Sequence, residues 1–392
     1  MLRAVDADTH IFESPQVWDF IDEQMYARRP IIVSAPRDTV YKRGSFWLID
    51  GNIFPKSAGK GGFLLGTPTE PGQIETTPDV RARELLDIVG RLEAMDSMGV
   101  DIQVIYPTLF LAYVTDDARL EVALCRSYNQ FMAKVWQSGQ GRLRWVAVPP
   151  LRSIDASIEE INVARQHGAV GVFFRGIERD RTLDDPYFFP VYQEAARLDM
   201  PICVHTGAGC PAFTAIFDVT RSHTFPHTRT LPLMAFRNLV ANKVPELFPG
   251  LRFGFIEAGA SWVPYVLHAL RSVFGGGPEQ WGPRLFQEYR LYSTYEEWED
   301  LPYLVNYVGE NNLVVGSDWG HHGGRARGGD PSGQPEVFAN MRSREDIGST
   351  VVTKLLSDNA RKLYGLPPQE VSSRDAGSPD ARPPRACGTS PT

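Results

Sequence analysis

Acidic and imidazole side chains stand at the ends of four apolar segments of the chain. Asp8 and His10 end the first, His205 ends a second, and Glu257 and Asp318 end two more. Residues two apart in an extended chain point to the same side, so Asp8 and His10 could hold one cation together. Carboxylate and imidazole ligands suit Zn²⁺, Mn²⁺ or Fe²⁺ without any thiolate. The pattern therefore predicts a divalent metal site, provided that the fold brings these segment ends together.

Each of these residues also has a structural alternative. A single histidine such as His205 is often a hydrogen-bonded structural residue, and Asp8 or Asp318 could cap a following helix. Ligand-type residues at the ends of four separate apolar segments would need four independent structural explanations. We therefore favour metal binding for the group as a whole.

The segments that must position these residues alternate between two periodicities. Short apolar runs typical of buried strands occur at residues 2–8, 102–106, 143–148, 170–174, 202–205, 252–257, 291–294 and 313–317. Segments with helical periodicity lie between them, at residues 81–98, 119–137, 154–167, 188–198, 262–272 and 301–310. Eight strand–helix units predict a (β/α)8 TIM barrel, in which active-site residues follow the carboxyl ends of the strands.

Two stretches fall outside this alternation. A Gly/Pro-rich insertion from about residue 30 to 78 contains an expected hairpin, residues 41–54, which turns near Asp50-Gly51-Asn52. We expect it to form a small cap over one barrel end. Residues 368–392 are rich in Pro, Ser, Gly and Ala, so burial cannot offset their ordering entropy, and we expect a disordered tail. The barrel domain is thus predicted to span residues 1–367.

The composition of the chain limits the classes of partner that it is expected to bind. The chain has 392 residues and a formal net charge of −7, which argues against nucleic acid or an anionic membrane surface and favours a small-molecule substrate. Its four cysteines show no CxxC spacing, and no apolar stretch approaches the length of a membrane span. We see no basic, apolar leader at the start. A cytoplasmic protein is the expectation.

Further polar residues follow the same strand ends. Arg175 ends the fourth run, and its planar fork suits a substrate carboxylate, although a salt bridge to Glu257 or Asp318 is an equal alternative. His321 follows Asp318 and could orient that carboxylate or move a proton. Two histidines after the fifth run, His223 and His227, are candidates for substrate contact.

Several motifs in order carry a resemblance to a known family. They are residues 6–10 (Asp-Ala-Asp-Thr-His), 91–96 with 99–104, 204–207 (Val-His-Thr-Gly), 316–318 (Gly-Ser-Asp) and 358–364 (Asp-Asn-Ala-Arg-Lys-Leu-Tyr). The set resembles the amidohydrolase-related family, which includes aminocarboxymuconate-semialdehyde decarboxylase and the resorcylate and carboxyvanillate decarboxylases. The resemblance covers about residues 2–366.

This resemblance implies a metal-dependent TIM-barrel enzyme with one divalent ion, zinc first and manganese or iron as alternatives. Carried over by position, the ligands are Asp8, His10, His205 and Asp318. Many members have two histidines where this chain has Asp8 and His10. The decarboxylases usually carry a proton-handling histidine at the sixth strand, where this chain has Glu257. That carboxylate is therefore either an extra ligand or the acid/base itself.

The first functional hypothesis is non-oxidative decarboxylation of a small aromatic or unsaturated carboxylic acid. The alternative is a hydrolase acting on an amide, ester, lactone or C–C bond, with metal-activated water and Glu257 as general base. A metal-stabilised binding protein without catalysis is a third possibility, and the cost of burying so many polar strand ends argues against it. The resemblance to this family also suggests that the chain forms a homodimer.

Overall fold

Eight parallel strands form one nearly closed barrel. The computed structural model describes residues 3–36, 43–56, 59–70, 79–207, 210–211, 215–218, 229–321 and 336–369. Around the sheet the strands are β1 (Ala4–His10), β5 (Val100–Tyr106), β6 (Leu143–Ala147), β7 (Ala169–Arg175), β10 (Ile202–His205), β11 (Phe253–Ile256), β12 (Leu291–Thr294) and β13 (Leu313–Val314). The two ends of the sheet meet where Ala7 N donates to Val315 O at 2.9 Å. The predicted TIM barrel is confirmed.

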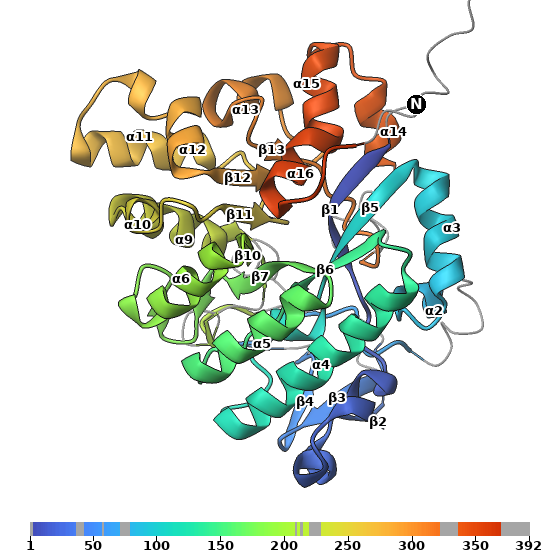
Figure 1. Ribbon diagram of the computed structural model, residues 1–392. Coiled ribbons are helices and arrows are strands. Elements are labelled where there is room, and N and C mark those ends of the chain that lie inside the picture. Colours follow the sequence, from blue (N-terminus) through green and yellow to red (C-terminus); the bar gives the residue numbers. More distant parts are fainter. Residues whose placement is uncertain are drawn as a thin grey trace, which may run out of the picture.

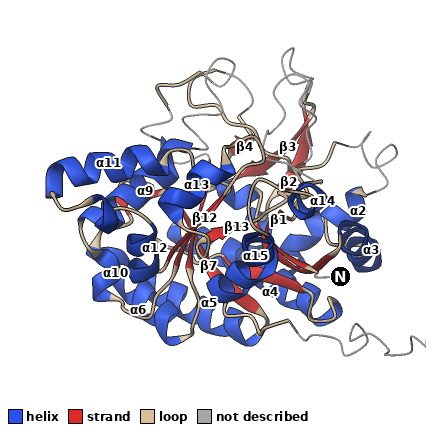
Figure 2. Cartoon of the chain, turned by 90° about the horizontal axis from the view of Figure 1, so that it is seen from above, coloured by secondary structure: helices blue, strands red, loops and turns tan. Residues whose placement is uncertain are grey.

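Helices surround the strands on their outer side (Figures 1 and 2). They are α2 (Val80–Arg83), α3 (Ile88–Met98), α4 (Ala118–Ser138), α5 (Ile154–Gln166), α6 (Phe189–Arg197), α9 (Thr230–Ala241), α10 (Val244–Leu247), α11 (Val263–Phe274), α12 (Pro283–Tyr289), α13 (Leu301–Val308), α14 (Val337–Arg342), α15 (Ser349–Thr353) and α16 (Asn359–Tyr364). In α4, Leu120, Leu124, Tyr128 and Met132 are buried at intervals of four, so one stripe faces the sheet.

One expected helix is divided in two. Residues 81–98 were predicted as a single helix, but α2 ends before a turn in which Leu85 takes a positive φ of 54°. Helix α3 begins after this turn, because the Asp87 side chain accepts a hydrogen bond from Gly90 N at 2.9 Å and caps the new helix. Periodicity alone did not reveal this capping signal.

The insertion after β1 contains a small antiparallel sheet. Its strands are β2 (Ile31–Ser34), β3 (Ser45–Ile49) and β4 (Asn52–Phe54), and the predicted turn at Asp50-Gly51 has φ values of 49° and 76°. Two positive φ values in a two-residue turn match the twist of a hairpin. In Figure 1 this sheet lies near the end of the barrel toward which β1 runs.

The insertion reaches across the barrel mouth. Lys60 and Asp218 form an isolated antiparallel bridge, and Gly61 N donates to Phe217 O at 3.0 Å. Residues 217 and 218 follow β10, which stands fifth in the strand order, half-way around the barrel from β1. A contact between segments that leave opposite sides must pass over the mouth. The insertion therefore covers the end of the barrel where strand-end residues gather, as a cap should.

The C-terminal helix secures the first strand. The Tyr364 hydroxyl of α16 donates to the Ala7 carbonyl at 2.7 Å and lies 2.7 Å from the Tyr106 hydroxyl. This contact ties the strand that carries Asp8 and His10 to the end of the barrel domain. The expected disordered tail, 368–392, lies outside the described residues apart from its first two positions. No helix in the described part of the chain is long and apolar enough to cross a membrane.

Gly176 offers a test of how β7 packs against α9. A Cβ atom at this glycine would lie 2.2 Å from the backbone carbon of Leu231. Gly176→Ala should therefore lower the free energy of unfolding by about 3 kcal/mol, because the backbone cannot yield without moving α9. Gly250→Ala is the control, since no atom lies within 4 Å of its new Cβ. Urea unfolding of both variants checks this, and equal stabilities would contradict the packing.

Candidate metal centre

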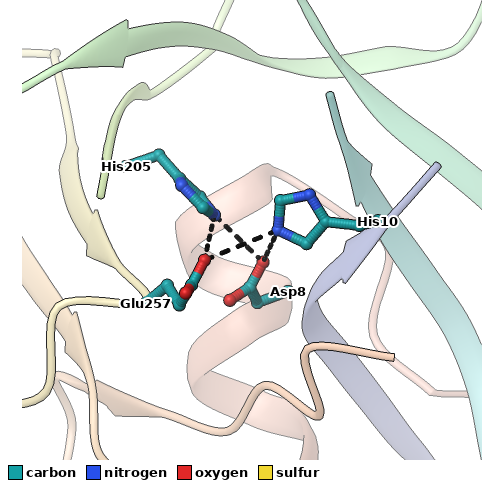
Figure 3. A group of neighbouring side chains, drawn as sticks. All are labelled: Asp8, His10, His205 and Glu257. Atoms are coloured by element: carbon teal, nitrogen blue, oxygen red, sulfur yellow. Dashed lines mark hydrogen bonds and ion pairs between the residues drawn. The ribbon is translucent and has the colours of Figure 1, made fainter. Parts of the chain in front are cut away.

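Three strands bring four ligand-type side chains to one point inside the barrel mouth. Asp8 and His10 come from β1, His205 ends β10, and Glu257 directly follows β11 (Figure 3). His205 Nε2 lies 3.4 Å from Asp8 Oδ1 and 3.4 Å from Glu257 Oε2. His10 Nε2 lies 3.5 and 3.6 Å from the same two oxygens. All four ligand atoms lie within 4.8 Å of one another, and all four residues are buried.

A second set of side chains shares two members with the first. Asp318 follows β13, and its Oδ1 lies 3.5 Å from His10 Nε2 and 2.9 Å from His321 Nδ1. The His321 ring stacks on the His10 ring, with 3.8 Å between their centroids. His10, Glu257, Asp318 and His321 also place their ligand atoms within 4.8 Å of one another. The structure therefore brings together Asp8, His10, His205, Asp318, Glu257 and His321.

Backbone turns aim two of these carboxylates into the mouth. Glu257, directly after β11, has a φ of 51°, and Asp318, a few residues past β13, has a φ of 48°, so both occupy the left-handed region. This conformation costs a residue other than glycine about 1 to 2 kcal/mol. Leu85 and Asp50 take the same conformation in ordinary turns of this chain, so the conformation by itself does not mark a functional site.

Carbonyl groups fix the two histidine rings in the tautomer that metal binding requires. His10 Nδ1 lies 3.1 Å from the Pro107 carbonyl oxygen, and His205 Nδ1 lies 2.9 Å from the carbonyl oxygen of Thr206. A carbonyl can only accept, so each Nδ1 carries the hydrogen. The other nitrogen of each ring, Nε2, then faces the carboxylates, as it does in histidines that bind a metal through Nε2.

The electrostatics of the cluster call for a cation. Burial alone would raise the pKa of Asp8, but His205 and His10 outweigh it and hold that pKa below its usual range. His10 Nε2 is buried and has no hydrogen-bond partner among the described residues. Glu257 and Asp318 add two more buried carboxylates. A divalent metal ion fits this donor set, since it satisfies the imidazole lone pairs and offsets the negative charge together.

Arg175 lies at the end of β7, but its guanidinium is occupied. Nε and Nη2 donate to the Glu178 carboxylate at distances down to 2.7 Å, and Nη1 donates to the carbonyl oxygens of Phe110 and Ala112. The ring of Tyr113 lies 4.0 Å from the guanidinium carbon. The salt bridge considered from the sequence therefore exists, with Glu178 as its partner in place of Glu257 or Asp318. The two other substrate-contact candidates, His223 and His227, lie outside the described residues.

Three residues that the sequence analysis did not single out support the cluster. The Thr108 hydroxyl lies 2.9 Å from His321 Nε2, and the buried Glu13 carboxylate accepts from the backbone N–H of Thr108 at 2.9 Å. Arg229 donates to the carbonyl oxygen of Glu257 and to the carboxylate of Glu296. Thr108 lies two residues past β5, so the strand-end rule could have included it. Glu13 and Arg229 give no comparable signal, because each lies in an irregular segment.

A family model described as amidohydrolase matches residues 5–366, nearly the whole of the described chain. The chain belongs to the amidohydrolase family. Members of this family are largely metal-dependent decarboxylases of aromatic or unsaturated acids. The resemblance seen in the sequence motifs is therefore confirmed.

Individual relatives are distant. The chain is 23% identical over 306 residues to 2-amino-3-carboxymuconate-6-semialdehyde decarboxylase of Dictyostelium discoideum, covering 75% of this chain and 78% of the relative. The fold of this chain is similar to that of an amidohydrolase from Mycobacterium avium subsp. paratuberculosis, with a TM-score of 0.67 and 17% identity. The match covers 93% of this chain and 99% of the other.

A third relative was solved with a metal ion. It is the 5-carboxyvanillate decarboxylase of Novosphingobium aromaticivorans, complexed with manganese and 4-hydroxy-3-methoxy-5-nitrobenzoic acid. The TM-score is 0.58 at 18% identity, and the match covers 75% of this chain and 86% of that chain. At this level of identity the similarity shows a shared amidohydrolase fold.

Metal content is the direct test of the cluster. His205→Ala and Asp318→Ala should each lower the amount of divalent metal bound per chain several-fold, because each removes a buried donor atom from the site. His268→Ala is the matched control, since His268 is an exposed histidine of α11 outside the cluster. Elemental analysis of the purified proteins measures the content, and circular dichroism confirms the fold. Full occupancy in both ligand variants would refute the assignment.

Proposed function

We propose that the chain is a metal-dependent, non-oxidative decarboxylase of a small aromatic or unsaturated carboxylic acid. The observation that carries this proposal is the buried convergence of Asp8, His10, His205, Glu257 and Asp318 at the mouth of an amidohydrolase barrel. The decarboxylases among its relatives support the choice of reaction.

The proposed cofactor is one divalent ion held by Asp8, His10, His205 and Asp318. Zinc is our first assignment, because two imidazoles and a few carboxylates are ordinary zinc ligands. Manganese and iron accept the same donor types, and manganese is present in one relative. When bound, the ion would supply positive charge that stabilises the electron density developing on the substrate.

The protein's own residues would supply position and protons. Decarboxylation breaks the bond between the carboxylate and its carbon, releases CO₂, and leaves an electron pair on that carbon, which must then receive a proton. Glu257 and His321 are the proposed proton-handling groups, since both lie in the cluster. The insertion that crosses the mouth would limit the access of water to this step.

The remaining proposals concern substrate contacts, the oligomeric state and the cellular location. Arg175 stays a proposed contact for a substrate carboxylate, and this contact would require its salt bridge with Glu178 to open. His223 and His227 remain proposed substrate contacts. The homodimer and the cytoplasmic location stay predictions, which sedimentation and cell fractionation would test.

A hydrolase is the second candidate function, and one observation favours it. Glu257 places a carboxylate at the end of β11, beside both ligand histidines, where it could take a proton from an attacking water. In that reaction the substrate would be an amide, an ester, a lactone or an activated C–C bond.

A panel of carboxylic acids tests the decarboxylase proposal. Purified protein should release CO₂ from at least one aromatic or unsaturated acid, and a chelator should abolish this activity, with recovery when metal is returned. Chelator-resistant release would contradict the metal dependence. No release from any acid, combined with turnover of an amide, ester or lactone panel, would contradict the decarboxylase and support the hydrolase.

Glu257→Gln separates the two roles of this residue. If Glu257 is an acid/base, kcat should fall by about 10² or more while metal content stays normal, because the amide cannot exchange the proton. If it is a ligand, metal content should fall and activity should recover partly in excess metal. Kinetics and elemental analysis on the same preparation distinguish these results.

Isotopes identify the reaction itself. Decarboxylation in D₂O should place deuterium on the carbon that lost CO₂, since that carbon takes its proton ultimately from solvent. Hydrolysis in H₂¹⁸O should place ¹⁸O in a product instead. Mass spectrometry of the products reads both labels, and ¹⁸O incorporation without CO₂ would overturn the first choice.

A further inference from the structure

The Thr108 hydroxyl lies among groups whose hydrogen-bonding roles are limited. It lies 2.7 Å from the carbonyl oxygen of Ile11, 2.9 Å from His321 Nε2 and 3.4 Å from His10 Nδ1. A hydroxyl has one proton, and the carbonyl can only accept, so the proton points to Ile11. Toward His321 the Thr108 oxygen must then accept, and His321 Nε2 must carry a hydrogen.

We propose that Thr108 is a positioning residue of the metal centre: its hydroxyl holds His321 as the Nε2–H tautomer and thereby directs Nδ1 at Asp318. In this tautomer a neutral ring presents the Nδ1 lone pair to Asp318 Oδ1 at 2.9 Å. Two lone pairs at this distance repel each other, so the pair needs positive charge, either from a metal ion or from a proton on Nδ1. The inference deepens the proposed function, because it rests on the same cluster binding a metal ion.

The hydrogen bonds of the Thr108 side chain do not serve to cap the turn that follows it. Thr108 precedes a short 3-10 turn, Leu109–Leu111, but its side chain makes no capping hydrogen bond to that turn. Its oxygen instead contacts two segments that are distant in sequence, the end of β1 and the residues after Asp318. The hydroxyl is fully buried. The Thr108 hydroxyl therefore hydrogen-bonds to segments that carry members of the metal cluster, and not to its own turn.

Glu13 holds the backbone of this loop in place. One oxygen of its carboxylate accepts from Thr108 N at 2.9 Å, and the other accepts from Leu109 N at 2.9 Å. Burial raises the pKa of Glu13 to about 7, so keeping a carboxylate here is costly. The two backbone bonds offset part of this cost. They also fix the position from which the Thr108 hydroxyl reaches His321.

Two substitutions at Thr108 separate the hydroxyl from the shape of the side chain. Thr108→Val has nearly the same shape without the hydroxyl, and Thr108→Ser keeps the hydroxyl. In the same loop, Thr115→Val is the matched control, because the Thr115 hydroxyl donates to Asp50 Oδ2 at 2.6 Å and contacts no histidine. Circular dichroism and thermal unfolding establish that each variant is folded before further measurement.

Metal affinity is the first readout. Competition with a chelating dye should show that Thr108→Val binds Zn²⁺ about tenfold or more weakly. A loss of this size is typical when a residue that orients a metal site by hydrogen bonding is removed. Thr108→Ser and Thr115→Val should bind Zn²⁺ as the parent does. Unchanged affinity in Thr108→Val, or an equal loss in Thr108→Ser, would overturn the proposal.

The tautomer of His321 is the second readout and needs neither metal nor substrate. In protein labelled with ¹⁵N-histidine, two-bond ¹H–¹⁵N spectra distinguish Nε2–H from Nδ1–H rings, and His321→Asn identifies the signal. The parent and Thr108→Ser should show Nε2–H, whereas Thr108→Val should lose this preference. The same tautomer in all three proteins would overturn the proposal. Because neither readout uses turnover, a failure of the proposed decarboxylation would be seen separately.

Discussion

Three carboxylates buried at one point set the central constraint on this structure. Asp8, Glu257 and Asp318 are each at most 3% exposed, and all three approach the same His10 nitrogen. Two unit charges 4 Å apart repel by about 4 kcal/mol at the effective dielectric of a protein. Such a group cannot stay ionised without positive charge among its members. A resident cation is therefore the simplest physical account of why the barrel mouth is built in this way.

Other features of the mouth follow from that constraint. The histidine rings are held by backbone carbonyls at Nδ1, so their Nε2 atoms face inward, and left-handed turns aim Glu257 and Asp318 to the same point. Beneath the cluster, Asp6 accepts from the Ser317 hydroxyl at 2.6 Å and from Ser317 N at 2.9 Å. Burial nevertheless raises the pKa of Asp6 to about 7. These contacts join β1 to the strand that leads to Asp318.

The sequence predicted the barrel because strand and helix periodicities alternate regularly along it. All eight predicted runs overlap a barrel strand, and the strand-end rule found the residues that the fold brings together around His10. It could not find the partner of Arg175, because Glu178 lies in a short hairpin just past β7 whose return contact depends on packing. The division of 81–98 was missed for a similar reason, since one capping carboxylate outweighed the periodicity.

The position of Glu257 bears on which reaction the centre can perform. Its Oε2 lies 3.4 Å from His205 Nε2 and 3.6 Å from His10 Nε2, nearly the same distances as those of Asp8 Oδ1. A carboxylate at these distances is placed either to bind the ion or to exchange a proton beside it. Decarboxylation needs a proton at carbon, and His321 adjoins the cluster while bonded to the Thr108 hydroxyl. Because that bond places the hydrogen of a neutral His321 ring on Nε2, the ring must take up a proton at Nδ1, beside Asp318, before it can deliver one to that carbon.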